Sequence, residues 1–188
     1  MSKELFLDHR THRAFRDEPV DEAILHELYE LAKMGPTASN LNPIRIRFVT
    51  SDEAKERVID AVAEGNKAKT QSAPVVAIIA HDLDFANHIP TLAPHMNKDA
   101  YQSQDASKLA EVATENTWLS AGYLILAART LGLDCGPMSG FNKDKINDAF
   151  FAGTSLRADM LLNLGYGDAE ALYERGARLS FDEACQIL

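Results

Sequence analysis

Hydrophobic residues recur along this chain at helical spacing in some stretches and at strand spacing in others. One helix is predicted after Asp21, a suitable N-cap, and it ends at Gly35 and Pro36. Its apolar face consists of Ile24, Leu25, Leu28 and Leu31. Ser51 caps a second helix that contains Val58, Ile59 and Val62. The longest helical pattern spans residues 105–131, and shorter helices are expected near residues 5–9, 143–151 and 180–188.

Three other stretches have the composition of strands. Residues 44–48 alternate apolar and basic side chains, which predicts a half-exposed strand. Residues 74–80 form a continuous apolar run rich in β-branched side chains, as in a strand buried on both faces, and residues 160–164 resemble it. Strands and helices are interleaved, so we expect a single domain in which helices cover both sides of a sheet.

Two segments leave their role open. Residues 82–104 have no steady period and are too long for an ordinary connection, so they are a candidate lid in which His95, Asn97 and Tyr101 could contact a substrate. The helix over residues 105–131 is apolar nearly all round its middle and should be buried on all sides. It lies either between two subunits or in the core of one chain, and the sequence favours neither.

Composition and charge narrow the range of partners. The chain has 188 residues, of which 46% are hydrophobic and 25% charged, as in a globular domain. Its formal net charge is -9, which disfavours nucleic acid and anionic membranes as partners. Cys135 and Cys185 have no metal-ligand or CxxC spacing and are expected to be reduced thiols. We find no signal peptide and no apolar run of transmembrane length, so a cytoplasmic location is expected.

Three short polar stretches carry the candidate chemistry. The first contains Arg10, Thr11, His12 and Arg13, and its two guanidinium groups suit a phosphate. A helical turn or a tight bend would bring the two arginines to one side. The alternative is that they pair at the surface with Asp8, Asp17 or Glu18. In an acidic chain, local concentration of arginine is the feature that favours an anionic ligand.

The second and third stretches are read as turns rich in backbone donors. One runs through Pro36, Thr37, Ser39 and Asn40, and the other through Pro137, Met138, Ser139 and Gly140. Both could contact a planar ligand, and both could equally be ordinary helix-terminating or left-handed turns. The chain has no HExxH, GxGxxG, GxxxxGK[ST] or GxSxG motif, so metal, Rossmann, P-loop and hydrolase sites are unsupported.

Taken together, these stretches resemble the FMN-dependent nitroreductase family over nearly the whole chain. The resemblance implies an α+β fold, a three-layer α/β/α sandwich with a mixed, mostly antiparallel sheet, in an intertwined homodimer with FMN at its interface. It also implies a contact from residues 36–40 to the flavin of the other subunit. The residues matched to flavin binding are Arg10, Thr11, His12, Arg13, Pro36, Thr37, Ser39, Asn40, Asn66, Lys69, Pro137, Met138, Ser139, Gly140 and Arg178.

Within the family, the chain is most similar to the short malonic semialdehyde reductases of pyrimidine degradation. The supporting stretches are residues 132–141, 148–151, 164–168 and 178–185. The implied activity is ping-pong hydride transfer from NADH or NADPH through FMN to a small semialdehyde. No protein nucleophile, general acid or metal is assigned. Ser139 and Gly176 depart from the family's Glu and basic residue, which leaves the preferred donor open.

Two other functions are compatible with the same motifs. One is a broad-specificity nitroaromatic or quinone reductase, which an open apolar pocket would favour. The other is a non-redox flavin-binding dimer, which would hold FMN without oxidising NAD(P)H.

Overall fold

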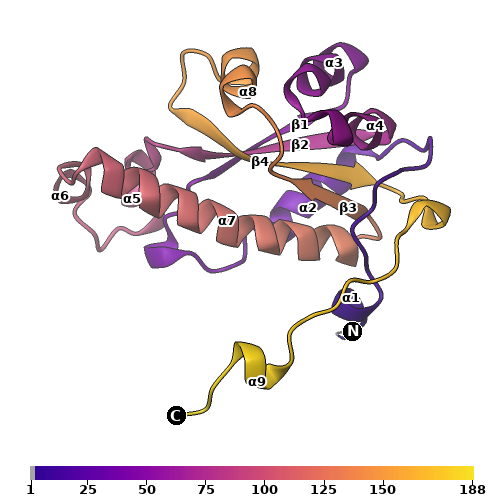
Figure 1. Ribbon diagram of the computed structural model, residues 1–188. Coiled ribbons are helices and arrows are strands. Elements are labelled where there is room, and N and C mark those ends of the chain that lie inside the picture. Colours follow the sequence, from indigo (N-terminus) through magenta and orange to yellow (C-terminus); the bar gives the residue numbers. More distant parts are fainter. Residues whose placement is uncertain (1–2) are drawn as a thin grey trace.

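The computed structural model describes residues 3–188 and has three layers, with an antiparallel sheet between two sets of helices (Figure 1). The sheet has the order β1-β2-β4-β3. Its strands are β1 (Ile44–Val49), β2 (Val75–Asp82), β3 (Asp134–Met138) and β4 (Leu156–Gly165). The expected α/β/α sandwich is confirmed. All strand pairs are antiparallel, and the parallel component among the described residues is an isolated bridge between Thr11 and Cys135.

The central strand β2 explains why helices cover both faces of the sheet. Every residue from Val75 to Asp82 is buried. Successive side chains of a strand point to opposite faces. Val75, Ala77 and Ile79 therefore enter one hydrophobic core, whereas Val76, Ile78 and Ala80 enter the other.

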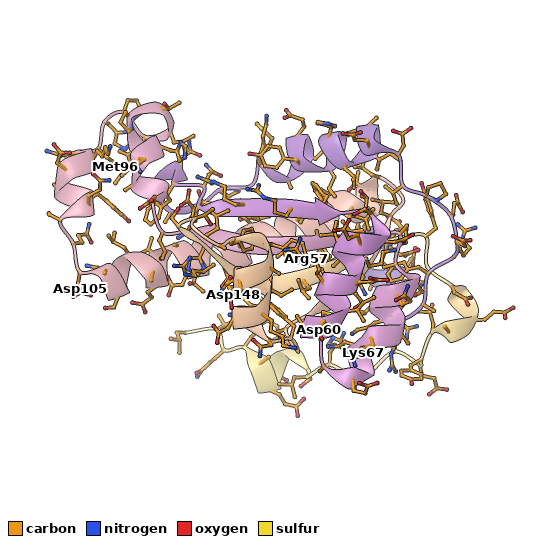
Figure 2. The ribbon with its side chains drawn as sticks, turned by 90° about the horizontal axis from the view of Figure 1, so that it is seen from above. Arg57, Asp60, Lys67, Met96, Asp105 and Asp148 are labelled. Atoms are coloured by element: carbon orange, nitrogen blue, oxygen red, sulfur yellow. The ribbon has the colours of Figure 1, made fainter. Side chains whose placement is uncertain are left out.

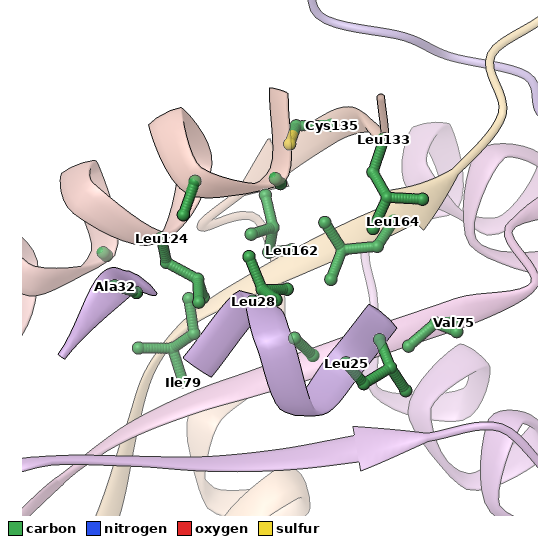
Figure 3. Packing of buried hydrophobic residues seen from close by; sticks show 14 of the residues in the cluster. Leu25, Leu28, Ala32, Val75, Ile79, Leu124, Leu133, Cys135, Leu162 and Leu164 are labelled. Carbon is green, nitrogen blue, oxygen red and sulfur yellow. The ribbon is translucent and has the colours of Figure 1, made fainter. Parts of the chain in front are cut away.

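The first core lies under α2 (Glu22–Ala32) and α7 (Ala106–Thr130) (Figure 3). Asp21 caps α2 by accepting a hydrogen bond from the Ala23 N–H, and Asp105 caps α7 in the same way at Ser107. Leu28 of α2 and Leu124 of α7 are completely buried against Leu162 of β4. These two helices thus form one outer layer.

The second core lies under α3 (Asp52–Ala61) and α8 (Lys143–Phe150), with α4 (Glu64–Ser72) beside them. Val58 and Ile146 are fully buried there. Figure 2 shows the outer surface of this layer, where Arg57, Asp60 and Asp148 come from α3 and α8. This surface carries charged side chains, as expected for the exposed face of amphipathic helices.

Residues 82–104 contain helices, so the prediction that this segment is irregular is wrong, whereas its role as a lid stays a prediction. They form the short helices η2 (Phe85–His88), α5 (Ile89–Leu92) and α6 (Lys98–Gln102) at one end of the molecule (Figure 1). Phe85 and Ile89 form a small core of their own with Leu41 and Ala113. Asn97 caps α6, and Tyr101 packs edge-on against Phe85, with ring centroids 5.8 Å apart.

Helix α1 (Glu4–Leu7) and the segment that leads to the C-terminal tail lie side by side near β3, whereas the tail itself runs away from the body (Figure 1). The carbonyls of Leu7 and His9 accept hydrogen bonds from Arg175. After η3 (Ala169–Ala171), the chain extends away from the body and ends with α9 (Phe181–Ala184), which has a capping box at Ser180 and Glu183. Leu179, Phe181 and Ile187 are all exposed on this tail.

Most predicted elements are confirmed, with three corrections. Helix α4 and strand β3 were not predicted as such; Gly136, Pro137 and Met138 belong to a strand rather than a turn. Leu31 is 43% exposed although it fits the apolar pattern of α2. Within one chain, helix α7 is not buried all round, because Trp118 and Leu119 are exposed; burial between two subunits stays a prediction. In the described residues, no helix is both long and apolar enough to span a membrane.

Candidate functional site

The segment with Arg10 and Arg13 runs beside the outer strand β3. Thr11 forms the parallel bridge with Cys135, and the His12 N–H donates to the Cys135 carbonyl at 2.9 Å. The chain bends at Arg13. Of the two arrangements expected for the arginines, the structure has the tight bend rather than the helical turn.

Both arginines meet at Tyr173, in the segment that leads to the tail. Arg10 donates to the Tyr173 carbonyl, and the Arg13 guanidinium lies 4.4 Å from the centre of the Tyr173 ring. Within residues 3–188, neither arginine forms an ion pair with an acidic side chain. Glu18 pairs with Arg16 instead, at 3.2 Å. The alternative that Arg10 and Arg13 serve surface ion pairs is therefore wrong.

Helix α4 brings a third cation to the same place. Lys69 lies on α4, and partial burial together with the positive charge of Arg13 lowers the pKa of its ammonium group. None of the ion pairs among residues 3–188 involves Lys69. A cationic group that is desolvated and repelled in this way gains stabilisation from any anion placed beside it.

Asn66 and the residues after β3 complete this group. The Asn66 side chain donates to the Gly140 carbonyl at 2.9 Å, one helical turn before Lys69. A Cβ atom at position 140 would lie 2.9 Å from the Asn66 amide nitrogen, so glycine permits this close approach. Ser139 and Gly140 are exposed, whereas the Met138 side chain is 7% exposed and belongs to the second core.

The His12 side chain lies beside Asp134 of β3. Its ring is buried, with Nε2 3.2 Å from Asp134 Oδ1. Asp134 also accepts a hydrogen bond from the Gly167 N–H at 2.9 Å. The imidazole therefore ties the arginine segment to β3 and to the end of β4. Asp134 was not singled out from the sequence, since a lone Asp ahead of a Gly-Pro pair has no distinctive pattern.

Residues 36–40 lie elsewhere in the chain. They include the short helix η1 (Ala38–Asn40), and they contact α7 through Asn116 and Tyr123. The Asn40 side chain donates to the Leu92 carbonyl of α5 at 2.8 Å. Among the described residues, no hydrogen bond or ion pair joins this loop to Arg10, Arg13 or Lys69 of the same chain. Arg178 is also apart: its guanidinium bonds the nearby carbonyls of Gly176 and Ala177.

A groove of about 1160 Å³ lies between α2 and the outer strand β1. Leu25 and Tyr29 of α2 face Ile46 and Phe48 of β1 across it. Asn40 and Leu92 lie at one end of the groove. It does not include the arginine segment, so within one chain the groove and the cationic cluster are separate features.

The site thus groups Arg10, Arg13 and Lys69, with Asn66 and Gly140 beside them, at one end of an α/β/α sandwich. Residues 7–166 match the model of the nitroreductase family, and the chain belongs to that family. A relative from Leptothrix cholodnii, provisionally named NADH dehydrogenase/NAD(P)H nitroreductase, is 50% identical over 98% of this chain and 94% of its own length. One from Stenotrophomonas maltophilia, named in the same way, is 52% identical over the same shares.

Solved structures show the same fold. The nitroreductase-like protein YdfN from Bacillus subtilis has a TM-score of 0.87 at 21% identity, covering 99% of this chain and 98% of its own. A protein from Exiguobacterium sibiricum, provisionally described as a nitroreductase and solved in complex with FMN, has a TM-score of 0.86 at 20% identity, covering 98% and 96%. At such low sequence identities, the similarity to these two structures shows a shared fold and nothing further.

The contact of Gly167 with His12 can be tested by adding one methyl group. A Cβ atom at position 167 would lie 1.9 Å from His12 Nδ1, so Gly167→Ala must displace the buried ring from Asp134. We expect Gly167→Ala to lower the free energy of unfolding by about 1–3 kcal/mol. Gly65→Ala is the matched control, because nothing lies within 4 Å of that Cβ position in α4. The free energy of unfolding of each variant can be measured in urea. Equal values for the two variants would disprove the contact between Gly167 and His12.

Proposed function

We propose that the protein is an FMN-dependent NAD(P)H oxidoreductase in which Arg10, Arg13 and Lys69 hold the flavin. The observation that supports this most directly is the cluster of these cations without acidic partners, in a chain whose net charge is -9. Elsewhere in the same chain, arginines do pair with acids, as Arg45 does with Asp82 at 2.8 Å. The cluster therefore suits an anionic ligand better than a structural role.

The residues present fit a flavin mononucleotide. Arginine binds phosphate through two parallel charge-assisted hydrogen bonds, which suits Arg10 or Arg13. Lys69, whose pKa is lowered by burial and by Arg13, would be stabilised by negative charge on the reduced ring. Asn66 and the exposed backbone at Ser139 and Gly140 add neutral hydrogen-bonding groups at the same place. Thr11 and Pro137 lie within the same two segments.

The bound flavin would supply the hydride chemistry, and the protein's part is to bind, orient and exclude water. No side chain is assigned as nucleophile or general acid. Met138 and His12 contribute through packing, since both side chains are buried below the cluster. NADH and NADPH remain alternative electron donors. The absorption spectrum of the holoprotein would distinguish them if it is followed anaerobically while each donor is added.

The arginine assignment can be tested by flavin titration. Loss of a charge-assisted hydrogen bond costs about 1.5–3 kcal/mol, or roughly ten- to a hundredfold in affinity. We expect Arg10→Ala and Arg13→Ala to weaken FMN binding by that factor, measured by quenching of flavin fluorescence. Arg16→Ala is the matched control, because Arg16 is 59% exposed and already pairs with Glu18. Wild-type affinity in both test variants would remove these arginines from the site.

We also propose that the enzyme is a homodimer in which residues 36–40 of one subunit serve the flavin of the other. Two observations support this. Thr37, Ser39 and Asn40 do not contact the cationic cluster of their own chain, although they resemble a flavin-binding element. Helix α7 exposes Trp118 and Leu119, with exposed fractions of 41% and 47%, on the side away from its core. Large apolar side chains exposed together on one helix indicate an interaction surface.

The mass in solution tests the dimer. Light scattering at micromolar concentration should give about twice the chain mass of 20.7 kDa. Leu119→Glu should shift the protein toward the monomer, because it places a charge on the apolar surface. Glu115→Gln, one turn earlier at an exposed position of α7, is the control and should remain dimeric. A wild-type monomer with FMN bound would contradict this proposal while leaving the flavin assignment intact.

For the acceptor, we propose a small aldehyde with a carboxylate, of the malonic semialdehyde type. The support is the resemblance in residues 136–141 and 164–168, together with the exposed imidazoles of His88 and His95. Asn97 and Tyr101 no longer support it, since one caps α6 and the other packs against Phe85. The provisional names of the relatives favour the alternative, a nitroaromatic reductase.

Reoxidation of the reduced enzyme distinguishes these acceptors. We expect kcat/KM for malonic semialdehyde to exceed that for an uncharged aldehyde of equal length by at least tenfold, since an unmatched carboxylate anchor leaves donors unpaired. Equal values for the two aldehydes would reject a carboxylate anchor. Rapid reoxidation by a nitrobenzene derivative alone would assign the protein as a nitroreductase in activity. FMN binding without oxidation of NADH or NADPH would indicate the non-redox alternative.

A further inference from the structure

The loop between α2 and β1 has a strained backbone. Ser39, Asn40 and Asn42 have positive φ angles of 49°, 58° and 43°. Residues other than glycine rarely adopt this conformation, and asparagine tolerates it better than most. Several such residues in one short loop persist only where the surroundings hold them in place. The question is therefore which part of the molecule holds this loop.

Helix α7 contacts the loop at two points on one face. Asn116 Oδ1 accepts a hydrogen bond from the Ala38 N–H at 2.7 Å. Seven residues later, the Tyr123 hydroxyl donates to the Pro36 carbonyl at 3.0 Å. A separation of seven places two residues on the same side of a helix. At Gly35 the contact is close, because a Cβ atom there would lie 2.0 Å from the Tyr123 ring.

The side-chain amide of Asn116 forms one hydrogen bond with its own helix and one with the loop. It is 6% exposed, and its Nδ2 donates to the Val112 carbonyl of its own helix at 2.9 Å. This bond fixes the side chain, so that Oδ1 is directed at Ala38. Asparagine is a weak helix former in a helix interior. Its side chain links the helix, through Val112, to the loop, through Ala38.

The loop in turn reaches the helical segment at the end of the molecule. Asn42 Nδ2 donates to the Asn40 side chain at 2.7 Å, and Asn40 Nδ2 donates to the Leu92 carbonyl. The loop is therefore held by hydrogen bonds on two sides, to Asn116 of α7 and to Leu92 of α5. Displacement of Ala38 would release the residues that carry the positive φ angles.

We propose that Asn116 is a positioning residue for the flavin site, which holds the Thr37–Asn42 loop in its strained conformation through the Ala38 N–H. The inference rests on the proposed function, in which this loop contacts the flavin of the partner subunit. Asn116 itself is buried in α7 and acts through the loop. Preorganisation of this kind increases affinity because the loop does not have to be ordered when the ligand binds.

The test compares Asn116→Ala with Ser120→Ala in the full-length holoprotein. Ser120 is also buried on α7, and its hydroxyl donates to the Asn116 carbonyl at 2.9 Å without touching the loop. For Asn116→Ala we expect FMN affinity to fall by roughly tenfold, because the Ala38 N–H loses the part-buried acceptor that holds the loop in place. The visible circular dichroism of bound flavin should change with it. Ser120→Ala should remain within about twofold of the wild type in affinity, with an unchanged spectrum.

Two results would overturn the proposal. One is wild-type FMN affinity together with an unchanged flavin spectrum in Asn116→Ala. The other is an equal loss of FMN affinity in both variants, which would indicate a general effect on the packing of α7. If Asn116→Ala does not fold, Tyr123→Phe takes its place under the same criteria. This variant removes only the hydroxyl that donates to the Pro36 carbonyl. Failure of the wild type to bind FMN would instead reject the proposed function, so the two failures are distinguishable.

Discussion

The complete burial of β2 is the constraint on which the rest of this structure depends. A strand without an exposed face needs helices on both sides, and here α2 and α7 supply one layer while α3 and α8 supply the other. β4 pairs with β2, and β3 pairs with β4. The position of β2 therefore determines where the outer strand β3 lies, and β3 is the strand along which the arginine segment runs.

The cationic cluster is the feature of this fold that packing does not explain. Arg10, Arg13 and Lys69 come from an extended segment and a helix that are far apart in sequence. The repulsion between Arg13 and Lys69 is not relieved by an ion pair with an acid, although the chain has an excess of acidic residues. Such an arrangement is unfavourable for the protein alone and favourable in the presence of an anion. Membership of the nitroreductase family is consistent with this reading.

Helix α7 combines roles that are usually divided among several elements. One face packs into the core through Leu124, another holds the strained loop through Asn116 and Tyr123, and a third exposes Trp118 and Leu119. This explains why the sequence left open whether the helix is buried in its own chain or between subunits. Its apolar composition reflects both a core and an exposed apolar surface.

Elements with a local sequence pattern could be predicted without the structure. Asp21, Ser51 and Asp105 cap the helices that the apolar periodicity predicts, and the run at 74–80 is the buried strand. Spacing also indicated Arg10 and Arg13 as a pair. These features depend on residues within one or two turns of each other, so a linear pattern records them.

Features that depend on residues far apart in sequence could be known from the folded chain alone. Gly136 and Pro137 suggest a turn locally, yet they form a strand because β4 offers partners for their backbone. Residues 82–104 fold because Leu41 and Ala113 complete a small core with Phe85. His12 contacts Asp134, Tyr173 lies beside the arginines, and Asn116 accepts a hydrogen bond from a loop 78 residues away in sequence. Contacts of this kind join segments with no common period, and they exist only once the chain has folded.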